Sequence, residues 1–185
     1  VLDPADHPDQ SFYDAHDPTI APAGLFQAPE VGYQYLETRD GTTLSVNVLP
    51  PLDPELSPPY PVVVDYSGYD PSDPDVFSSD PDHRPMFVAR AAGYAVVGVN
   101  LRGTTCSGGA YDYWETLQGL DGYDVIETVA AQPWAARVGM IGLSFPGISQ
   151  LFVAATQPPH LAAITPQSVI GDTYRSTLYP GGILN

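Results

Sequence analysis

The chain has 185 residues, of which 43% are hydrophobic, so it is long enough to bury a core as one domain. Its 22 acidic residues outnumber its 6 basic ones, and the net charge of -16 would repel phosphate backbones and anionic lipid headgroups. We therefore expect no nucleic-acid partner and no membrane-surface partner. A transmembrane segment is not expected either, because no run of about 18 apolar residues occurs.

The single cysteine, Cys106, allows no internal disulfide and no Cys-x-x-Cys pair for zinc or redox chemistry. We expect no metal and no other cofactor. The chain begins with Val1, which fits processing of a longer precursor but also fits simple trimming. The sequence fits more than one cellular compartment, and a secreted or cell-envelope location is favoured over the cytoplasm.

Residues 1–30 are rich in aspartate and proline and lack apolar periodicity, which predicts an extended acidic arm. His7 and His16 lie in this arm without the spacing of metal ligands, so a solvated loop is expected there. The acidic loop at residues 70–83 lacks the central glycine and the final glutamate of a calcium loop. Its Asp-Pro pairs favour turns, and His83 is expected at the surface.

Two alternating segments, residues 31–38 and 42–49, flank Asp40-Gly41 and predict a hairpin of two strands. A short apolar run at residues 62–65 predicts a strand that is buried on both faces. The later elements are expected at 85–92 (helix), 95–100 (strand), 120–131 (helix), 138–141 (strand), 144–156 (helix) and 162–166 (strand). This alternation predicts an α/β fold, with a mostly parallel sheet that carries helices on both faces.

The pattern Gly142-x-Ser144-x-x-Gly147 falls where a predicted strand passes into a predicted helix. In a nucleophile elbow, such a sharp turn projects the serine hydroxyl from the carboxyl edge of the sheet, and small neighbours avoid clashes. The helix N-terminus that follows stabilises developing negative charge. We therefore predict that Ser144 is a nucleophile, although Pro146 stands where the usual Gly-x-Ser-x-Gly motif has its second glycine.

Three segments of the chain occur in an order typical of one enzyme family: "GYAVVGVNLRGTTCSGG", "YDVIETVAAQPW" and "RVGMIGLSFPG". They resemble the aromatic-Ala-Val strand with its Asp-x-Arg-Gly loop, the helix with its Gln-Pro-Trp turn, and the Gly-x-Ser-Tyr-x-Gly elbow of the CocE/NonD serine hydrolases, the group that includes the S15 X-Pro dipeptidyl peptidases. The likeness covers roughly residues 31–170. It implies an α/β-hydrolase fold in which residues 31–167 form the N-terminal part and residues 168–185 begin a cap, with the remaining sheet, the cap and a jelly-roll domain outside this chain.

The resemblance also implies an oxyanion hole formed by the Tyr69 hydroxyl and the backbone N–H of Phe145. Tyr69 in "DYSGYD" matches the family's Tyr-Asp position better than Tyr66 does. Phe145 replaces the usual tyrosine after the nucleophile, which matters little because the backbone N–H is the donor.

Two further departures lie in the loop of Arg102, where Asn100 stands in place of aspartate and Thr105 in place of glycine. Both changes bear on how this loop packs beside the site. Arg102 itself is expected to anchor buried carbonyls or carboxylates rather than to take part in catalysis.

A serine nucleophile needs a histidine base and a carboxylate that orients it. His160 is the only histidine after Ser144 and follows it too soon, and Asp172 is the only acidic residue there. We therefore expect the triad Asp and His beyond residue 185 or on another chain. Three alternatives stay open: the N-terminal piece of a longer hydrolase, one chain of a cleaved enzyme, or a degenerate homologue that binds or scaffolds without catalysing.

The function predicted from the sequence is that of a serine hydrolase, which cleaves ester or amide bonds, acyl or peptidyl, through an acyl-enzyme on Ser144. Esterase, amidase, X-Pro dipeptidyl-peptidase and acyltransferase activities all fit this chemistry. The expected partners are a small ester or amide or a peptide as substrate, and the remainder of the hydrolase. The sequence is also compatible with a homo-oligomer.

Overall fold

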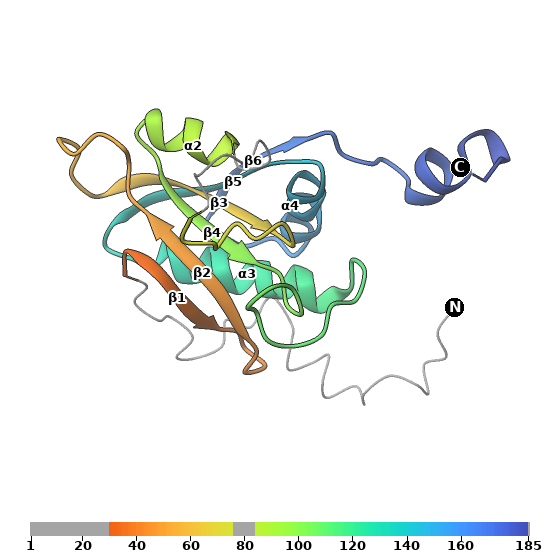
Figure 1. Cartoon of the computed structure of the whole chain (residues 1–185), viewed down its shortest axis with the longest axis horizontal. Helices are drawn as coiled ribbons and strands as arrows, with labels where there is room; N and C mark the ends of the chain where they lie inside the picture. Colours follow the sequence, from red (N-terminus) through yellow and green to blue (C-terminus); the bar gives the residue numbers. More distant parts are fainter. Residues whose placement is uncertain (1–29, 76–83, 185) are drawn as a thin grey trace.

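A six-stranded sheet with the order β1-β2-β4-β3-β5-β6 forms the centre of the computed structural model, which describes residues 30–75 and 84–184 (Figure 1). The strands are β1 (Gly32–Glu37), β2 (Thr43–Leu49), β3 (Tyr60–Ser67), β4 (Ala95–Asn100), β5 (Ala135–Leu143) and β6 (Leu161–Gln167). β1, β2 and β4 pair antiparallel, whereas β4, β3, β5 and β6 run parallel. The mostly parallel sheet predicted from the sequence is confirmed.

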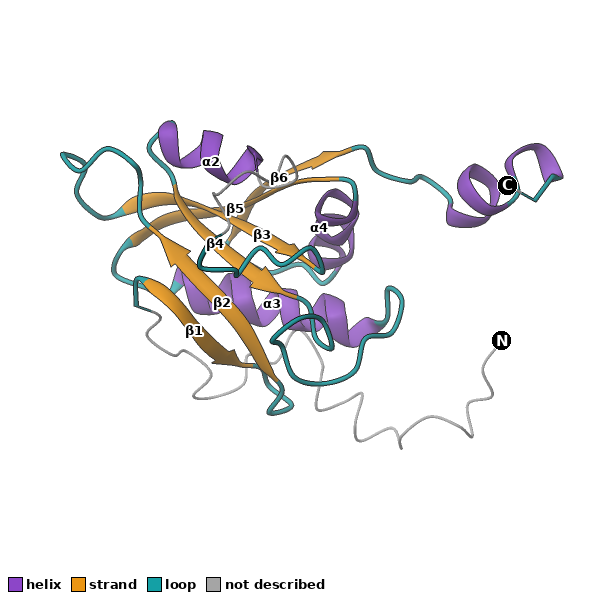
Figure 2. Cartoon of the chain, in the orientation of Figure 1, coloured by secondary structure: helices purple, strands orange, loops and turns teal. Residues whose placement is uncertain are grey.

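The helices cover both faces of the sheet (Figure 2). α2 (Arg84–Ala91) lies on one face, and α3 (Thr116–Ala130) and α4 (Phe145–Ala155) pack side by side on the other. Side chains of a strand alternate between the faces. Val62 and Val64 of β3 accordingly join the core under α3, whereas Val63 packs against the cluster under α2.

The β1–β2 hairpin turns at Asp40-Gly41, as its sequence predicts. Gly41 has a φ of 84°, and the N–H of Thr38 donates to the carbonyl of Thr42 across the turn at 2.8 Å. A glycine adopts this positive φ without the steric cost that a side chain brings. The hairpin therefore follows directly from local turn chemistry.

One helix is longer than expected: α3 starts at Thr116 and not at residue 120. Its first turn contains Gln118 and Gly119, which interrupt the apolar pattern although both are buried. The Gln118 Nε2 donates to the carbonyl of Asp112, so a contact with the preceding loop satisfies one of the two polar atoms of this amide, whereas its Oε1 has no hydrogen-bond partner among the described residues.

Several predictions fall on residues 1–29 and 76–83, which lie outside the described part of the chain. These are the acidic arm with His7 and His16, and the surface position of His83. The segment after β6, for which the sequence predicts the start of a cap, contains the short helical turns η3 (Thr173–Leu178) and η4 (Pro180–Gly182). Its residues are largely exposed, and it extends away from the sheet (Figure 1).

Asp65 places a carboxyl group inside the sheet. It lies in the middle of β3 with 2% of its surface exposed, and its Oδ1 has no hydrogen-bond partner within residues 30–75 and 84–184. Burial raises the pKa of Asp65 to about 7, although a hydrogen bond from Ser67 opposes the shift. Between pH 4 and 7 the folded chain thus binds more protons than the unfolded chain, so this group lowers the free energy of unfolding as the pH rises and has its full effect above pH 7.

We predict that Asp65→Asn, which removes the charge and keeps the shape, raises the free energy of unfolding at pH 8. The gain should reach a few kcal/mol, because each unit of pKa shift corresponds to about 1.4 kcal/mol. It should shrink as the pH falls toward 4. Urea unfolding of both proteins between pH 4 and 8 measures the difference, with the exposed Asp53→Asn as control. A difference that does not change with pH would contradict this account of Asp65.

Candidate active site

Ser144 occupies a sharp turn between the end of β5 and the start of α4. Its φ of 65° and ψ of -118° lie in a region that side chains rarely adopt. A non-glycine residue in such a conformation costs of order 1–3 kcal/mol, and strain of this kind concentrates at functional sites. The residue is exposed, at the edge of the sheet where the parallel strands end.

Backbone contacts on both sides hold this turn. The N–H of Ser144 donates to the carbonyl of Gln167 at the end of β6, at 2.9 Å. A Cβ on Gly147 would lie 2.3 Å from that same carbonyl oxygen, and a Cβ on Gly142 would lie 2.5 Å from the Cβ of Pro146. The two glycines are therefore required for close approach. Pro146 is tolerated because it occupies the first turn of α4, where an N–H has no partner within the helix.

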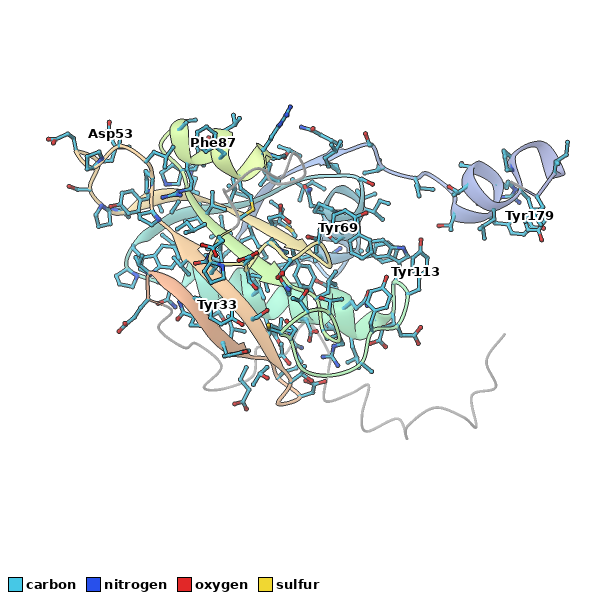
Figure 3. All side chains as sticks on the ribbon, in the orientation of Figure 1. Tyr33, Asp53, Tyr69, Phe87, Tyr113 and Tyr179 are labelled. Atoms are coloured by element: carbon cyan, nitrogen blue, oxygen red, sulfur yellow. The ribbon has the colours of Figure 1, made fainter. Side chains whose placement is uncertain are left out.

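The two residues that carry the predicted oxyanion donors are neighbours beside this turn. Phe145 is the first residue of α4, and Tyr69 follows two residues after the end of β3. The Tyr69 and Phe145 rings are 5.6 Å apart between centroids, and Figure 3 shows Tyr69 at the carboxyl end of the sheet. Tyr69 is 45% exposed, so the residue lies at the surface.

Tyr66 has a different environment from Tyr69. It is 1% exposed, and its hydroxyl donates to the carbonyl of Gln118 at 2.9 Å. Its phenol is therefore part of the core between β3 and α3.

An aromatic cluster around Phe145 was not predicted from the sequence. Trp114 stacks on Phe145 at 4.5 Å and on Phe152 of α4 at 4.8 Å, and the ring of Tyr111 lies 6.5 Å from Phe145. Trp114 holds a φ of 55°, which is a strained backbone conformation for a bulky residue. The dense aromatic run at residues 111–114 is the signal that could have indicated this cluster.

Arg102 is the anchor that the sequence predicts. It is 5% exposed, and its guanidinium donates two hydrogen bonds of 2.6 Å to Asp121 of α3 and one of 2.9 Å to Asp40 of the hairpin turn. Burial opposes ionisation of Asp40, but hydrogen bonds from Thr38, Thr42 and Arg102 outweigh it and lower the pKa of Asp40 to about 2. The residue therefore ties the hairpin and α3 to the loop after β4.

The two other departures in the Arg102 loop have distinct environments. Thr105 has a φ of 45°, a conformation that glycine adopts without strain and that a threonine side chain disfavours. Asn100 ends β4 and is completely buried.

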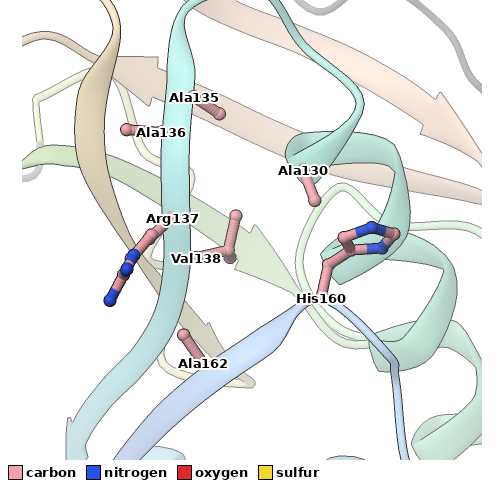
Figure 4. A pocket seen from close by; sticks show the side chains of 7 residues that line it. All are labelled: Ala130, Ala135, Ala136, Arg137, Val138, His160 and Ala162. Atoms are coloured by element: carbon pink, nitrogen blue, oxygen red, sulfur yellow. The ribbon is translucent and has the colours of Figure 1, made fainter.

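His160 and Asp172 both lie apart from Ser144. His160 precedes β6, whereas Ser144 pairs with the far end of that strand, so about 20 Å of strand separates them. The His160 Nδ1 lies 2.6 Å from Glu127, beside a hollow of about 200 Å³ lined mostly by alanine (Figure 4). Asp172 is paired with Arg175 in the segment that leaves the sheet.

Across residues 30–75 and 84–184, no group of three His, Cys, Asp or Glu residues is arranged to hold a metal ion. Within the same ranges, no helix has both the length and the apolarity needed to cross a bilayer.

Residues 40–185 match the family model of the X-Pro dipeptidyl-peptidases (S15 family). The chain belongs to this family. The matched range includes the Ser144 turn, Tyr69 and the Arg102 loop. The family resemblance predicted from the three motifs is confirmed.

Individual proteins are similar to this chain in sequence or in fold. The chain is 32% identical to the cocaine esterase of a Rhodococcus species over 149 residues, which cover 80% of this chain and 25% of that enzyme. A CocE/NonD family hydrolase of Staphylococcus aureus superimposes with a TM-score of 0.69 and 26% identity, covering 89% of this chain and 36% of that one. An α-amino acid ester hydrolase shares the fold at a TM-score of 0.64 and 21% identity, over 86% of this chain and 30% of its own. The chain thus spans well under half of these relatives.

We predict that Gly147→Ala disrupts the Ser144 turn, because its methyl group would overlap the Gln167 carbonyl. Hydrolytic activity of the complete protein should fall by about 100-fold or more, since small displacements at a reacting group have effects of this size. Gly171→Ala is the matched control, because nothing lies within 4 Å of the position of its Cβ. Circular dichroism shows whether the fold survives. Equal activity of the two variants would contradict the close packing at Gly147.

Proposed function

We propose that this chain carries the nucleophile and the oxyanion hole of a serine hydrolase that cleaves ester or amide bonds, acyl or peptidyl. The observation that carries the proposal is the conformation of Ser144: an exposed serine at a φ of 65° between β5 and α4, with Tyr69 and Phe145 beside it. Membership of the S15 family and similarity to esterases support the same chemistry.

In the proposed reaction, the Ser144 oxygen attacks the carbonyl carbon of the substrate while a base removes the hydroxyl proton. The carbonyl oxygen becomes an oxyanion, which accepts hydrogen bonds from the Tyr69 hydroxyl and the Phe145 N–H. The bond to the leaving group then breaks as that group takes up the proton, and water releases the acyl group from Ser144 by the reverse sequence.

The position of Phe145 suits the role of backbone donor. The N–H groups in the first turn of a helix have no acceptor within the helix, and the helix dipole favours negative charge there. One oxyanion donor contributes about 3 kcal/mol of transition-state stabilisation. Two donors from different strand ends would therefore supply a large share of the rate enhancement.

The proton-transfer groups of the proposed enzyme come from outside residues 1–185, either from later sequence or from another chain. His160 lies at the opposite end of β6 from Ser144, and Asp172 is bound to Arg175 in the segment beyond the sheet. The relatives are also several times longer than the part that matches this chain. The substrate class proposed is a small ester or amide, or a peptide.

Ser144→Ala should abolish labelling of the complete protein by a fluorophosphonate probe, because only an activated serine reacts with this reagent. Ser176→Ala, which removes an exposed serine from η3, should label as the wild type does. Labelling that persists in Ser144→Ala would refute the assignment of the nucleophile. A wild-type protein that does not label at all would instead favour a homologue that binds without catalysing.

Tyr69→Phe should lower kcat by about 100-fold or more with little change in KM, because its hydrogen bond to the oxyanion forms mainly in the transition state. Tyr66→Phe is the matched control: it also loses one hydroxyl, but that hydroxyl is bound to the Gln118 carbonyl in the core. It should lower the unfolding temperature and leave kcat nearly unchanged. The reverse pattern would show that the wrong tyrosine was assigned.

A further inference from the structure

A buried side chain of the neighbouring strand β4 contacts the loop that carries Tyr69 at two points. Asn100, the last residue of β4, is 0% exposed. Its Nδ2 donates to Oδ1 of Asp70 at 2.9 Å, and its Oδ1 accepts the N–H of Ser72 at 3.1 Å. Both partners follow Tyr69 within three positions. The amide therefore fixes the chain directly after Tyr69 at two points.

The backbone of the same loop also packs closely against β4. A Cβ on Gly98 would lie only 1.9 Å from the carbonyl oxygen of Pro71. No side chain fits between the strand and the loop at this point. Gly98 and Asn100 are two residues apart on β4 and therefore share one face of the sheet, so they form a single docking edge for the loop.

Buried hydroxyl groups extend this contact to β2 and to the loop after β4. The Ser72 hydroxyl donates to the Ser45 hydroxyl at 2.9 Å, and the Ser107 hydroxyl donates to the backbone carbonyl of Asn100 at 2.8 Å. Ser45 and Ser72 are at most 1% exposed. Satisfied hydrogen-bond networks of this kind in a low-dielectric interior rigidify what they connect.

We propose that Asn100 is a positioning residue for the Tyr69 hydroxyl. Tyr69 is nearly half exposed and is packed against the ring of Phe145, so the direction of its phenol depends on the backbone of its own loop. The two hydrogen bonds of Asn100 fix the position of that backbone. This inference rests on the proposed function, in which Tyr69 donates to the oxyanion.

The chemistry of the amide explains why asparagine serves here. It offers one donor for the Asp70 carboxylate and one acceptor for the Ser72 N–H, which is what the two partners require. An alanine at position 100 would remove both groups and would leave the Asp70 carboxylate and the Ser72 N–H without this partner. The backbone after Tyr69 would then lose two of the hydrogen bonds that fix it.

The test measures kcat and KM of the complete protein with a p-nitrophenyl ester. Asn100→Ala should lower kcat by about 10-fold to 100-fold, because small displacements of a catalytic group have effects of this size. KM should change by less than about threefold, since the lost interaction belongs to the transition state. Asn100→Leu, which has about the same volume but neither hydrogen-bonding group, should show the same pattern and covers the case in which the alanine variant fails to fold.

A control variant separates loss of stability from loss of positioning. Gln132→Leu removes a buried amide at the far end of α3 from the site and should lower stability without lowering kcat.

The decisive measurement repeats Asn100→Ala in a Tyr69→Phe background. If Asn100 acts through the Tyr69 hydroxyl, its removal should cost little further kcat once that hydroxyl is absent. An equal loss in both backgrounds, or an unchanged kcat in Asn100→Ala while Tyr69→Phe lowers it, would overturn the positioning role alone. An unchanged kcat in Tyr69→Phe would instead remove the proposed oxyanion donor, and this inference with it.

Discussion

The close approach between the Ser144 turn and the end of β6 is the constraint on which the site depends. The Gln167 carbonyl accepts the N–H of Ser144 and leaves no room for a side chain on Gly147. Strand pairing between β5 and β6 thus holds the serine in a conformation that it would not adopt by itself. The strain is local, and the hydrogen bonds of the sheet compensate for it. α4 then begins at the next residue and directs its amino end toward the same surface.

The two proposed oxyanion donors reach this surface by different means. Phe145 is fixed covalently to Ser144 and is enclosed by Trp114, whose own backbone is strained. Tyr69 comes from another strand end, and its loop depends on the buried contacts with β4. The Arg102 pairs with Asp121 and Asp40 hold the intervening loop in place. The relative position of Phe145 and Tyr69 therefore depends on several contacts between distant segments, not on one rigid element.

The sequence predicts the parts of this structure that local chemistry determines. Apolar runs located β3, β4 and β5, the Asp40-Gly41 pair located the hairpin, and the spacing of glycines around Ser144 located the turn. Tyr69 required a family resemblance, because an isolated tyrosine in a loop has no distinguishing pattern. Its assignment as a donor stays a prediction.

Several contacts between distant segments could not be predicted from sequence patterns. The stacking of Trp114 between Phe145 and Phe152 joins residues more than thirty positions apart, and no periodicity records it. The buried first turn of α3 was missed because Gln118 is polar, and its burial rests on a contact outside the helix, from its Nε2 to the Asp112 carbonyl. Asn100 was visible only as a departure from a family pattern, and the structure shows that it binds Asp70 and Ser72.

The central claim is that Ser144, Tyr69 and Phe145 form one acyl-transfer site. A crystal structure of the complete protein with a boronic acid inhibitor tests it most directly. The account predicts a boron–oxygen bond to Ser144, with the oxygen that mimics the oxyanion about 2.7–3.1 Å from both the Tyr69 hydroxyl and the Phe145 N–H. An adduct on another residue, or an oxygen that points away from both donors, would contradict the account.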